Sequence, residues 1–376
     1  MSVTAYDAIV VGGGPAGSSC ATILARAGRK TLVLEKADFP RPKICGDCIH
    51  PKVWPLFDQL GVSEEFRRMP LNIIRRFSIT NQTGANVSVD LEENKDRPFF
   101  SIMRSDLDDI LLRFAAESGA EILVRHELTD VRKEGNGWEV AVRNHNGSTI
   151  LRFRCQKLIG ADGRNSLVAK QLRNLGLAQS SLVPHDRCGV QWHTQYQEAV
   201  GGSVEMYMFE HGYAGVVNCS HETATIGMVA SPEVASLAKK DFPLFLRKTL
   251  HANNKARLRI PSCDPNDNVL TASPIQPRRT AIEGEGARLI GDARQTVEPF
   301  TGQGVLFAMR DGISSGLSIA RNSSPSDSGN RAITFPNRIV SPVLQRSYYA
   351  NSLISLGSHF PRITSSLAHG LWVHHG

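Results

Sequence analysis

Residues 6–17 read YDAIVVGGGPAG, and this stretch decides how the chain folds. The apolar, β-branched run before the glycines predicts a buried strand that leads directly into a tight turn. Residues 18–27 then predict a helix that ends at Gly28. A second apolar run at 31–34 predicts another buried strand, which Glu35 closes. The order strand, turn, helix and strand indicates an α/β protein.

Three glycines of this turn form the pattern G-x-G-x-x-G. Gly12 allows the tight turn, Gly14 lets a pyrophosphate approach the backbone, and Gly17 lets helix and strand pack closely. The N–H groups at the start of the helix attract the phosphates. Glu35 lies 18 residues after Gly17, where a carboxylate accepts a hydrogen bond from a ribose hydroxyl. We therefore predict that a dinucleotide contacts Gly12, Gly14, Pro15, Ala16, Gly17, Glu35 and Lys36. The alternative is a glycine-rich turn in another kind of α/β protein, with Glu35 as a solvated strand end.

The composition is that of an ordinary globular protein. The 376 residues are 41% hydrophobic and 21% charged, which is enough chain for one large domain or two interleaved ones. No apolar run approaches ~18 residues, so we expect no membrane-spanning helix. Residues 1–6 lack the positive segment of a signal peptide, and we therefore expect a cytoplasmic protein.

The formal net charge is +7, but Lys and Arg are scattered along the chain. No nucleic-acid motif accompanies them, so we expect no nucleic-acid partner and interpret the charge as a surface that suits an anionic cofactor. Peripheral contact with an anionic membrane stays open. The seven cysteines are odd in number and widely spaced, which argues against a disulfide framework.

Residues 41–48 read RPKICGDC and predict a loop, because prolines and a glycine exclude regular structure. Cys45 and Cys48 form a C-x-x-C pair, which is typical of a redox dithiol. The alternative is two unrelated thiols in a loop that lines a cofactor site.

Two later motifs follow the glycine-rich turn in a fixed order, at 160–163 (GADG) and at 291–304 (GDA, then PFTGQG). The ordered set resembles the flavoprotein superfamily of aromatic hydroxylases (p-hydroxybenzoate hydroxylase), flavin halogenases and geranylgeranyl reductases. The resemblance covers most of residues 5–320, and it implies that the dinucleotide is FAD.

The resemblance assigns roles to individual residues. Asp292 is expected at the FAD ribityl or pyrophosphate side, and Asp162 near the pyrophosphate. The turn of Gly302, Gln303 and Gly304 is expected to aim helix N–H groups at the flavin N1–C2=O edge. Arg104 is similar to the family's cofactor-contacting arginine; the alternative is a surface charge at a helix end.

The stretch 43–47, KICGD, is similar to the K-x-C-G-D loop of geranylgeranyl reductases. In that group the loop borders the flavin and the substrate cavity, so we expect Cys45, Gly302 and Gly304 to be the catalytic positions and expect no metal. The Tyr/Trp-Phe-Pro strand of those reductases has no counterpart at 212–218, and the halogenase G-W-x-W-x-I-P signature is absent. The dithiol flavoenzymes would need a second G-x-G-x-x-G unit for NAD(P)H, and the sequence has none.

The alternating pattern at 73–100, with turn signals at 81–84, predicts a β-hairpin, and the alternation at 189–230 predicts further strands. Residues 231–250 are expected to form a helix. These segments indicate a second, strand-rich domain. We therefore expect an α/β fold in which a Rossmann-like FAD-binding domain is interleaved with a β-sheet substrate domain. The FAD-binding domain is expected at 1–75, 101–185 and 270–320, and the substrate domain at 76–100 and 186–269. Residues 321–376 are expected to form a linker and a helical tail.

Two reactions follow from the resemblance. A reductase would transfer hydride from reduced flavin N5 to a C=C bond, with a nearby acid as proton source. The alternative is an NAD(P)H-dependent aromatic hydroxylase that acts through a flavin C4a-hydroperoxide. In both, the cofactor carries the chemistry and the protein excludes water. The substrate is expected to be small and apolar or aromatic, and NAD(P)H or another electron donor is expected to bind transiently. A flavin-binding protein without catalysis is a third interpretation, and the oligomeric state is not predicted.

Overall fold

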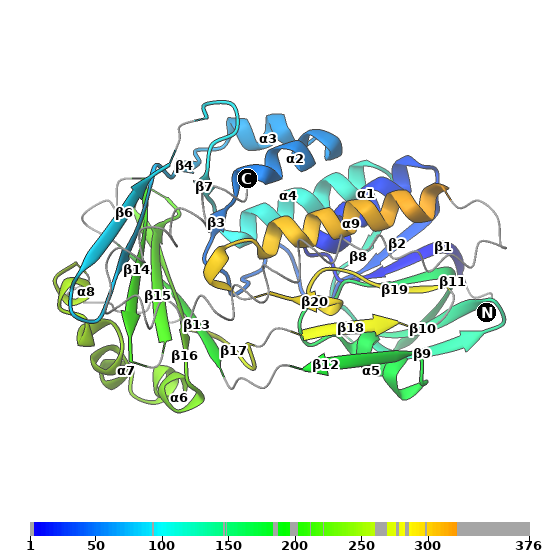
Figure 1. Ribbon diagram of the computed structural model, residues 1–376. Helices are drawn as coiled ribbons and strands as arrows, with labels where there is room; N and C mark the ends of the chain where they lie inside the picture. Colours follow the sequence, from blue (N-terminus) through cyan, green and yellow to red (C-terminus); the bar gives the residue numbers. More distant parts are fainter. Residues whose placement is uncertain are drawn as a thin grey trace.

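The computed structural model describes residues 4–91, 94–145, 147, 149–182, 187–195, 202–210, 212–220, 222–259, 269–275, 278–282, 286–297 and 299–321. Two seven-stranded sheets lie side by side in this part of the chain (Figure 1). The fold is α/β, as the sequence predicts. The predicted tail lies, from residue 322 on, outside the described residues.

The first sheet is parallel on one side and antiparallel on the other. Its order is β8 (Glu121–Leu123), β2 (Thr31–Leu34), β1 (Thr4–Val11), β11 (Ile150–Gly160), β10 (Gly137–Asn144) and β9 (His126–Glu134), and β19 (Ala287–Leu289) also pairs with β11. β1 runs parallel to β2 and β11, whereas β10 is antiparallel to both β9 and β11. The strand–turn–helix–strand unit of residues 6–35 thus lies at the centre of the parallel part.

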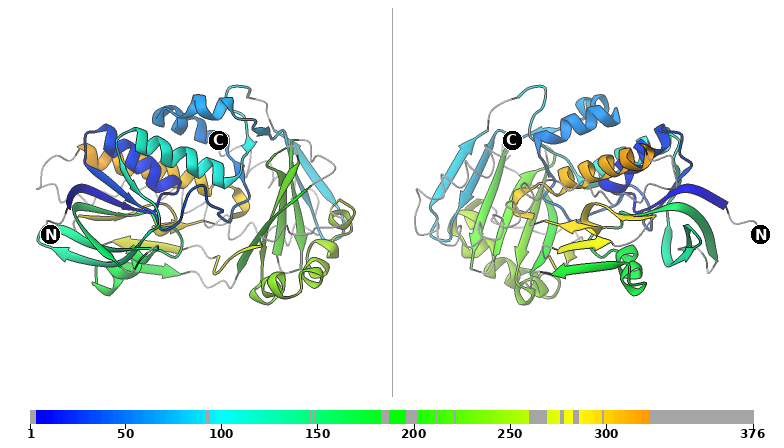
Figure 2. Two further views of the ribbon diagram at one scale, coloured as in Figure 1. Left: turned by 180° about the vertical axis from the view of Figure 1, so that it is seen from behind. Right: turned by 45° about the vertical axis from the view of Figure 1, so that its right-hand side comes forward.

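Both faces of β1 are buried, which explains its continuous apolar run. Ala8 and Val10 pack in a cluster with the helices, and Ile9 and Val11 pack in a second cluster that includes Trp138 of β10. The helical face carries α1 (Pro15–Arg26), α4 (Arg104–Glu117) and α9 (Gly304–Arg321), which lie together in all views (Figures 1 and 2). α5 (Leu167–Asn174) packs in the cluster on the opposite face.

The second sheet has the order β17 (Leu270–Ala272), β13 (Cys188–Gln195), β16 (Thr223–Ala230), β15 (Gly212–Asn218), β14 (Ser203–Phe209), β5 (Arg76–Thr80) and β6 (Asn86–Asp90). β5 and β6 form the predicted hairpin, which joins this sheet because β5 pairs in parallel with β14. Trp192 and Val216 on one face, the outer face, pack against α6 (Pro232–Lys240) and α7 (Phe242–Lys248). The inner face is the opposite one, and it carries Val217 and Tyr213.

Smaller elements connect the two sheets. One small sheet joins β3 (Cys48–Ile49), β7 (Phe100–Ser101) and β4 (Asn72–Ile73), and another joins β12 (Ala178–Leu182), β18 (Arg278–Ile282) and β20 (Gln295–Thr296). The remaining helices are α2 (Trp54–Leu60), α3 (Ser63–Arg68) and α8 (Asn254–Arg259). Short 3₁₀ turns lie at Pro51–Val53, Leu250–Ala252, Gly291–Ala293 and Pro299–Thr301. No helix among the described residues is both long and apolar enough to cross a membrane.

Two details differ from the expectations. The helix expected over 231–250 is divided at Asp241, whose Oδ1 accepts a hydrogen bond from Leu244 N at 2.9 Å and begins α7. Pro243 lacks an N–H group and cannot continue the ladder of α6. β17 lies in the second sheet because it pairs with β13, although the expected division places residues 270–320 with the FAD-binding domain. The rest of that division stays a prediction.

Candidate functional site

The glycine-rich turn is held by close backbone contacts. A Cβ on Gly12, whose φ is +107°, would lie 2.4 Å from the Ala161 carbonyl oxygen, and one on Gly17 would lie 1.9 Å from the Gly12 carbonyl oxygen. Gly14 differs, since the nearest atom to its Cβ position is Arg41 Nη2 at 3.5 Å. Gly14 is also the N-cap of α1 and provides no side-chain hydrogen bond to the helix. The turn therefore packs tightly on one side and leaves the N–H groups of α1 open on the other, as an anion site requires.

Glu35 is buried at the end of β2 and is not a solvated strand end. Its Oε2 accepts a hydrogen bond from Gly13 N at 2.8 Å, and its Oε1 accepts one from Ala37 N at 2.9 Å. The carboxylate thus ties β2 to the glycine-rich turn. Its contact with a ribose stays a prediction, as do the contacts of Pro15, Ala16 and Lys36.

Asp162 acts as a cap for α5. Its carboxylate accepts hydrogen bonds from Ser166 Oγ at 2.6 Å and from Leu167 N at 2.7 Å. Burial raises the pKa of Asp162, and these donors oppose that shift. The carboxylate therefore already has partners, and its predicted place near the pyrophosphate depends on the neighbouring backbone.

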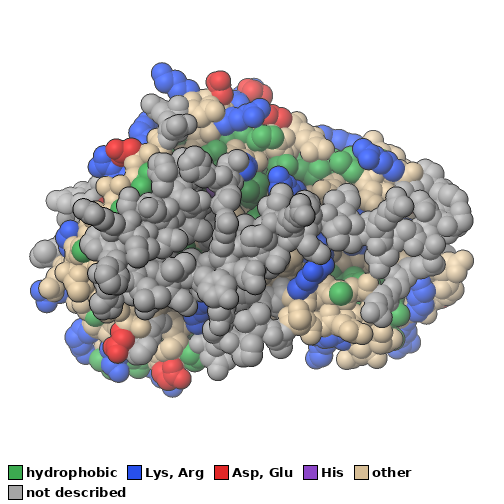
Figure 3. Space-filling view, in the orientation of Figure 1, with side chains coloured by type: hydrophobic (Ala, Val, Ile, Leu, Met, Phe, Trp, Pro, Cys, Tyr) green, Lys and Arg blue, Asp and Glu red, His purple; other side chains and the backbone are tan. Residues whose placement is uncertain are grey.

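Basic side chains gather above the glycine-rich turn. Lys43 Nζ lies 3.7 Å from the Cβ position of Gly163. Burial lowers the pKa of Lys43, Asp292 opposes that shift, and Arg104, Arg41 and Arg164 reinforce it. Such a cluster of cations close to a helix N-terminus suits a pyrophosphate. Elsewhere, on the face shown in Figure 3, the Lys and Arg side chains of the described residues are dispersed.

Arg104 begins α4 and is not a surface charge, because only 10% of its side chain is exposed. Its Nε and Nη2 donate to the two carboxylate oxygens of Asp108, each at 2.9 Å. Its guanidinium also opposes the rise in the pKa of the Cys45 thiol. Arg104 therefore contacts the KICGD loop, through its N–H and Asp47 Oδ1. Its contact with the cofactor stays a prediction.

The C-x-x-C pair does not have the features of a reactive dithiol. Cys45 and Cys48 are both free thiols. Burial raises the pKa of both, although Arg104 partly opposes the shift at Cys45. Reactive cysteines have lowered pKa values, so these surroundings favour the cavity-lining alternative.

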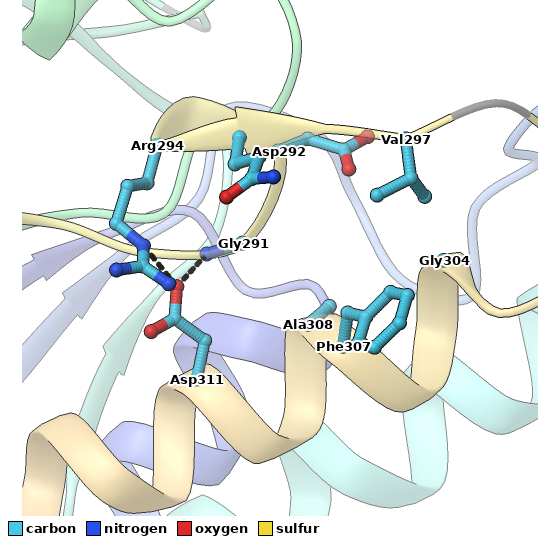
Figure 4. A pocket seen from close by; sticks show the side chains of 9 residues that line it. Gly291, Asp292, Arg294, Val297, Gly304, Phe307, Ala308 and Asp311 are labelled. Carbon is cyan, nitrogen blue, oxygen red and sulfur yellow. Dashed lines mark hydrogen bonds and ion pairs between the residues drawn. The ribbon is translucent and has the colours of Figure 1, made fainter. Parts of the chain in front are cut away.

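Asp292 lies on the 3₁₀ turn that follows β19, beside a hollow at the start of α9 (Figure 4). Asp311 of α9 fixes this turn, because its Oδ2 accepts hydrogen bonds from Gly291 N at 2.9 Å and Arg294 Nε at 3.0 Å. The sequence interpretation missed Asp311. The available signal was an acidic residue at a position of the α9 sequence where the helical period places apolar residues. The hollow is lined by Gly291, Asp292, Arg294, Gln295, Val297, Gly304, Phe307, Ala308 and Asp311.

The turn before α9 connects this region to the second sheet. Gly302 has a φ of +63°, and Gln303, which is buried, accepts a hydrogen bond at its carbonyl oxygen from Phe307 N. Phe300 packs edge-on against Tyr213 of β15, with ring centroids 5.1 Å apart. The predicted flavin-facing turn at 302–304 therefore adjoins the inner face of the second sheet.

The KICGD loop lies along the same inner face. Cys45 N donates to Gln191 Oε1 of β13 at 2.7 Å, and Gly46 lies against Gly227 of β16. Asp47 is fully buried, and its Oδ2 accepts a hydrogen bond from Thr225 Oγ1 at 2.6 Å. These contacts join segments that are far apart in the sequence, and no local sequence pattern predicts them.

The molecule combines a glycine-rich dinucleotide turn, a later Gly-Asp turn and a second sheet beside them. This combination is typical of FAD-dependent oxidoreductases. The chain belongs to the FAD binding domain family, which matches residues 5–323. The protein is an FAD-dependent oxidoreductase, and its cofactor is FAD.

Curated relatives include two reductases. The menaquinone reductase of Mycolicibacterium smegmatis is 27% identical over 325 residues, which cover 82% of this chain and 75% of that protein. The geranylgeranyl diphosphate reductase of Rhodobacter capsulatus is 28% identical over 321 residues, which cover 82% of this chain and 73% of that protein. Among solved structures, a myxobacterial chondrochloren halogenase aligns with a TM-score of 0.75 and 22% identity over 86% of this chain and 77% of that chain. That last likeness concerns the fold alone.

Proposed function

We propose that this oxidoreductase reduces a C=C bond of a small apolar or aromatic substrate, in the manner of geranylgeranyl reductases. The observation that carries the proposal is the position of the KICGD loop, which lies between the glycine-rich turn and the inner face of the second sheet. Reductases among the relatives, such as the two reported above, support the same reaction class. The halogenase signature is missing from the sequence, so halogenation is not proposed.

The residues present fit FAD. The open backbone at Gly14 and the N–H groups of α1 would hold the pyrophosphate, Glu35 the ribose, and Asp292 the ribityl side. When bound, FAD supplies hydride transfer. The N–H groups of the Gly302 turn would stabilise negative charge on the ring.

The inner face of the second sheet supports an apolar substrate. Val204, Met206, Tyr213 and Val217 belong to one apolar cluster that also includes Phe300, beside the Gly302 turn. Apolar walls of this kind exclude water from the reacting atoms. NAD(P)H or another donor would bind transiently, because the sequence has one G-x-G-x-x-G unit.

The test supplies FAD-loaded protein, anaerobically reduced with dithionite, with geranylgeranyl diphosphate or 4-hydroxybenzoate. Mass spectrometry should detect a product that has gained hydrogen. A product that has gained oxygen in air would instead establish the hydroxylase alternative, and no product under either condition would refute both.

Two adjacent residues of β15 provide a matched pair for the substrate face. Val217 packs on the inner face and Val216 on the outer face. Val217→Thr should raise KM several-fold, because it places a hydroxyl of the same shape in the apolar wall. Val216→Thr should lower the melting temperature and leave KM unchanged. Equal effects on KM would show that the inner face does not contact the substrate.

A further inference from the structure

One row of side chains crosses the inner face of the second sheet and ends at a histidine. Strand register pairs Phe77 with Val204, Val204 with Val217, Val217 with Thr225, and Thr225 with His193. Residues directly opposite each other on neighbouring strands share one face. The side chains of this row are therefore apolar from Phe77 to Val217 and polar at Thr225 and His193.

Asp47 lies behind this histidine. Its Oδ2 is 3.4 Å from His193 Nε2 and accepts a hydrogen bond from Thr225 Oγ1 at 2.6 Å. Its backbone has a φ of +53°, which residues other than glycine rarely adopt, and Ile102 N holds it through a 3.0 Å hydrogen bond to its carbonyl oxygen. A strained backbone that is held by its surroundings is typical of functional sites.

The imidazole of His193 has one nitrogen committed and one available. Its side chain is 26% exposed, whereas that of Asp47 is 1% exposed. Nε2 faces Asp47, and Nδ1 has no hydrogen-bond partner within the described part of the chain. A carboxylate behind one ring nitrogen fixes the orientation of the ring, as in catalytic histidines.

We propose that His193 donates the proton of the reduction and that Asp47 positions it; this assignment rests on the proposed function. The π bond of the substrate breaks, and one of its carbons takes the proton of Nδ1–H. Reduced FAD, when bound, would supply the hydride for the other carbon, and with it the two electrons that reduce the double bond. The neutral imidazole then regains a proton from water.

Other titratable groups surround the pair. Cys219, which follows β15, lies with Asp47 and His193 so that one ligand-type atom of each falls within 4.8 Å of the others. The negative charge of Asp106 in α4 contributes, after burial, to the raised pKa of Cys219. Arg104 N donates a hydrogen bond to Asp47 Oδ1 at 3.3 Å. Because Thr225 and Arg104 N–H already donate to Asp47, and the Cys219 thiol donates to the Thr223 carbonyl oxygen, the group forms a hydrogen-bonded network.

The test measures product formation against pH for FAD-loaded protein, reduced with dithionite, with geranylgeranyl diphosphate. Wild-type activity should fall as pH rises, because the donor must be protonated. His193→Gln should lower kcat by about 100-fold and remove that pH dependence. FAD content and dithionite reduction of the flavin should stay unchanged. Imidazole in the buffer should restore part of the activity of His193→Ala, and Asp47→Asn should show a smaller loss with a shifted pH profile.

Gln195→Ala is the matched control, because Gln195 lies two residues further on the same strand and is exposed. It should behave as the wild type. A His193→Gln protein that keeps the wild-type rate and pH profile overturns this assignment. Activity that EDTA removes and a divalent cation restores overturns it as well. A wild-type protein that yields no reduced product overturns the proposed function itself.

Discussion

The glycine-rich turn and the KICGD loop both border the candidate flavin site, but different interactions hold them. Backbone contacts hold the turn, where a Cβ at Gly12 or Gly17 would lie within 2.4 Å of a carbonyl oxygen. Side chains from distant strands hold the loop, such as Gln191 at Cys45 N and Thr225 at Asp47. Backbone contacts at this distance demand glycine at fixed spacing, whereas side-chain contacts between distant segments demand only compatible partners. The first region therefore has a sequence signature, and the second has none of comparable strength.

The largest expected effect tests the turn. Gly17→Ala should abolish FAD binding and lower the free energy of unfolding by about 3 kcal/mol, because its Cβ would meet the Gly12 carbonyl oxygen at 1.9 Å. Gly14→Ala is the matched variant, since its Cβ would meet only Arg41 Nη2, at 3.5 Å. It should weaken FAD binding while the apoprotein keeps its stability. Denaturant unfolding and FAD titration of both variants provide the measurements. Equal destabilisation would contradict the division of roles between the two glycines.

The second prediction concerns the Gly-Asp turn at 291–292. Asp292→Ala should reduce FAD affinity at least tenfold, because a hydrogen bond to a charged group contributes ~1.5–3 kcal/mol. Asp311→Asn should also weaken FAD binding, but indirectly, by loosening the hold of Asp311 on Gly291 N and Arg294. Calorimetric titration and the melting temperature of the apoprotein separate the two variants. The Asp292 variant should keep its melting temperature and the Asp311 variant should not. Unchanged FAD affinity in Asp292→Ala would remove Asp292 from the site.

The sequence predicted those helices, strands and turns that are determined by residues close together in the chain. The apolar run of β1, the glycine-rich turn and the hairpin of β5 and β6 follow from periodicity and turn chemistry, and the structure contains all of them. The division of the helix at Asp241 was missed because apolar residues continue through it. This error concerns where an element ends and leaves its type unchanged.

The site was less predictable, because its polar contacts join segments that are distant in the sequence. His193 and Asp47 are separated by 146 residues, and Asp311 and Gly291 by 20. Neither pair has a spacing that periodicity could reveal. Asp162 shows the reverse problem: its motif was recognised, but the carboxylate caps α5, which only the fold could show.

The smallest expected effect distinguishes the two thiols of the loop. Cys45 contacts Arg104, beside the glycine-rich turn, whereas Cys48 packs against the apolar cluster of the inner face. Cys45→Ser should therefore lower turnover several-fold or alter substrate preference. Cys48→Ser should lower the melting temperature, since it places a hydroxyl against apolar side chains, and should leave turnover nearly unchanged.

Steady-state kinetics of both serine variants, with a thiol titration of the oxidised and the reduced protein, measure this difference. The raised pKa values of both thiols predict that neither is consumed when the flavin is reoxidised. A working dithiol would behave otherwise, because its two sulfurs act as a unit and loss of either one stops the reaction. Equal loss of turnover in both variants, with two thiols disappearing on oxidation, would therefore show that the loop carries redox chemistry and does more than line the cavity.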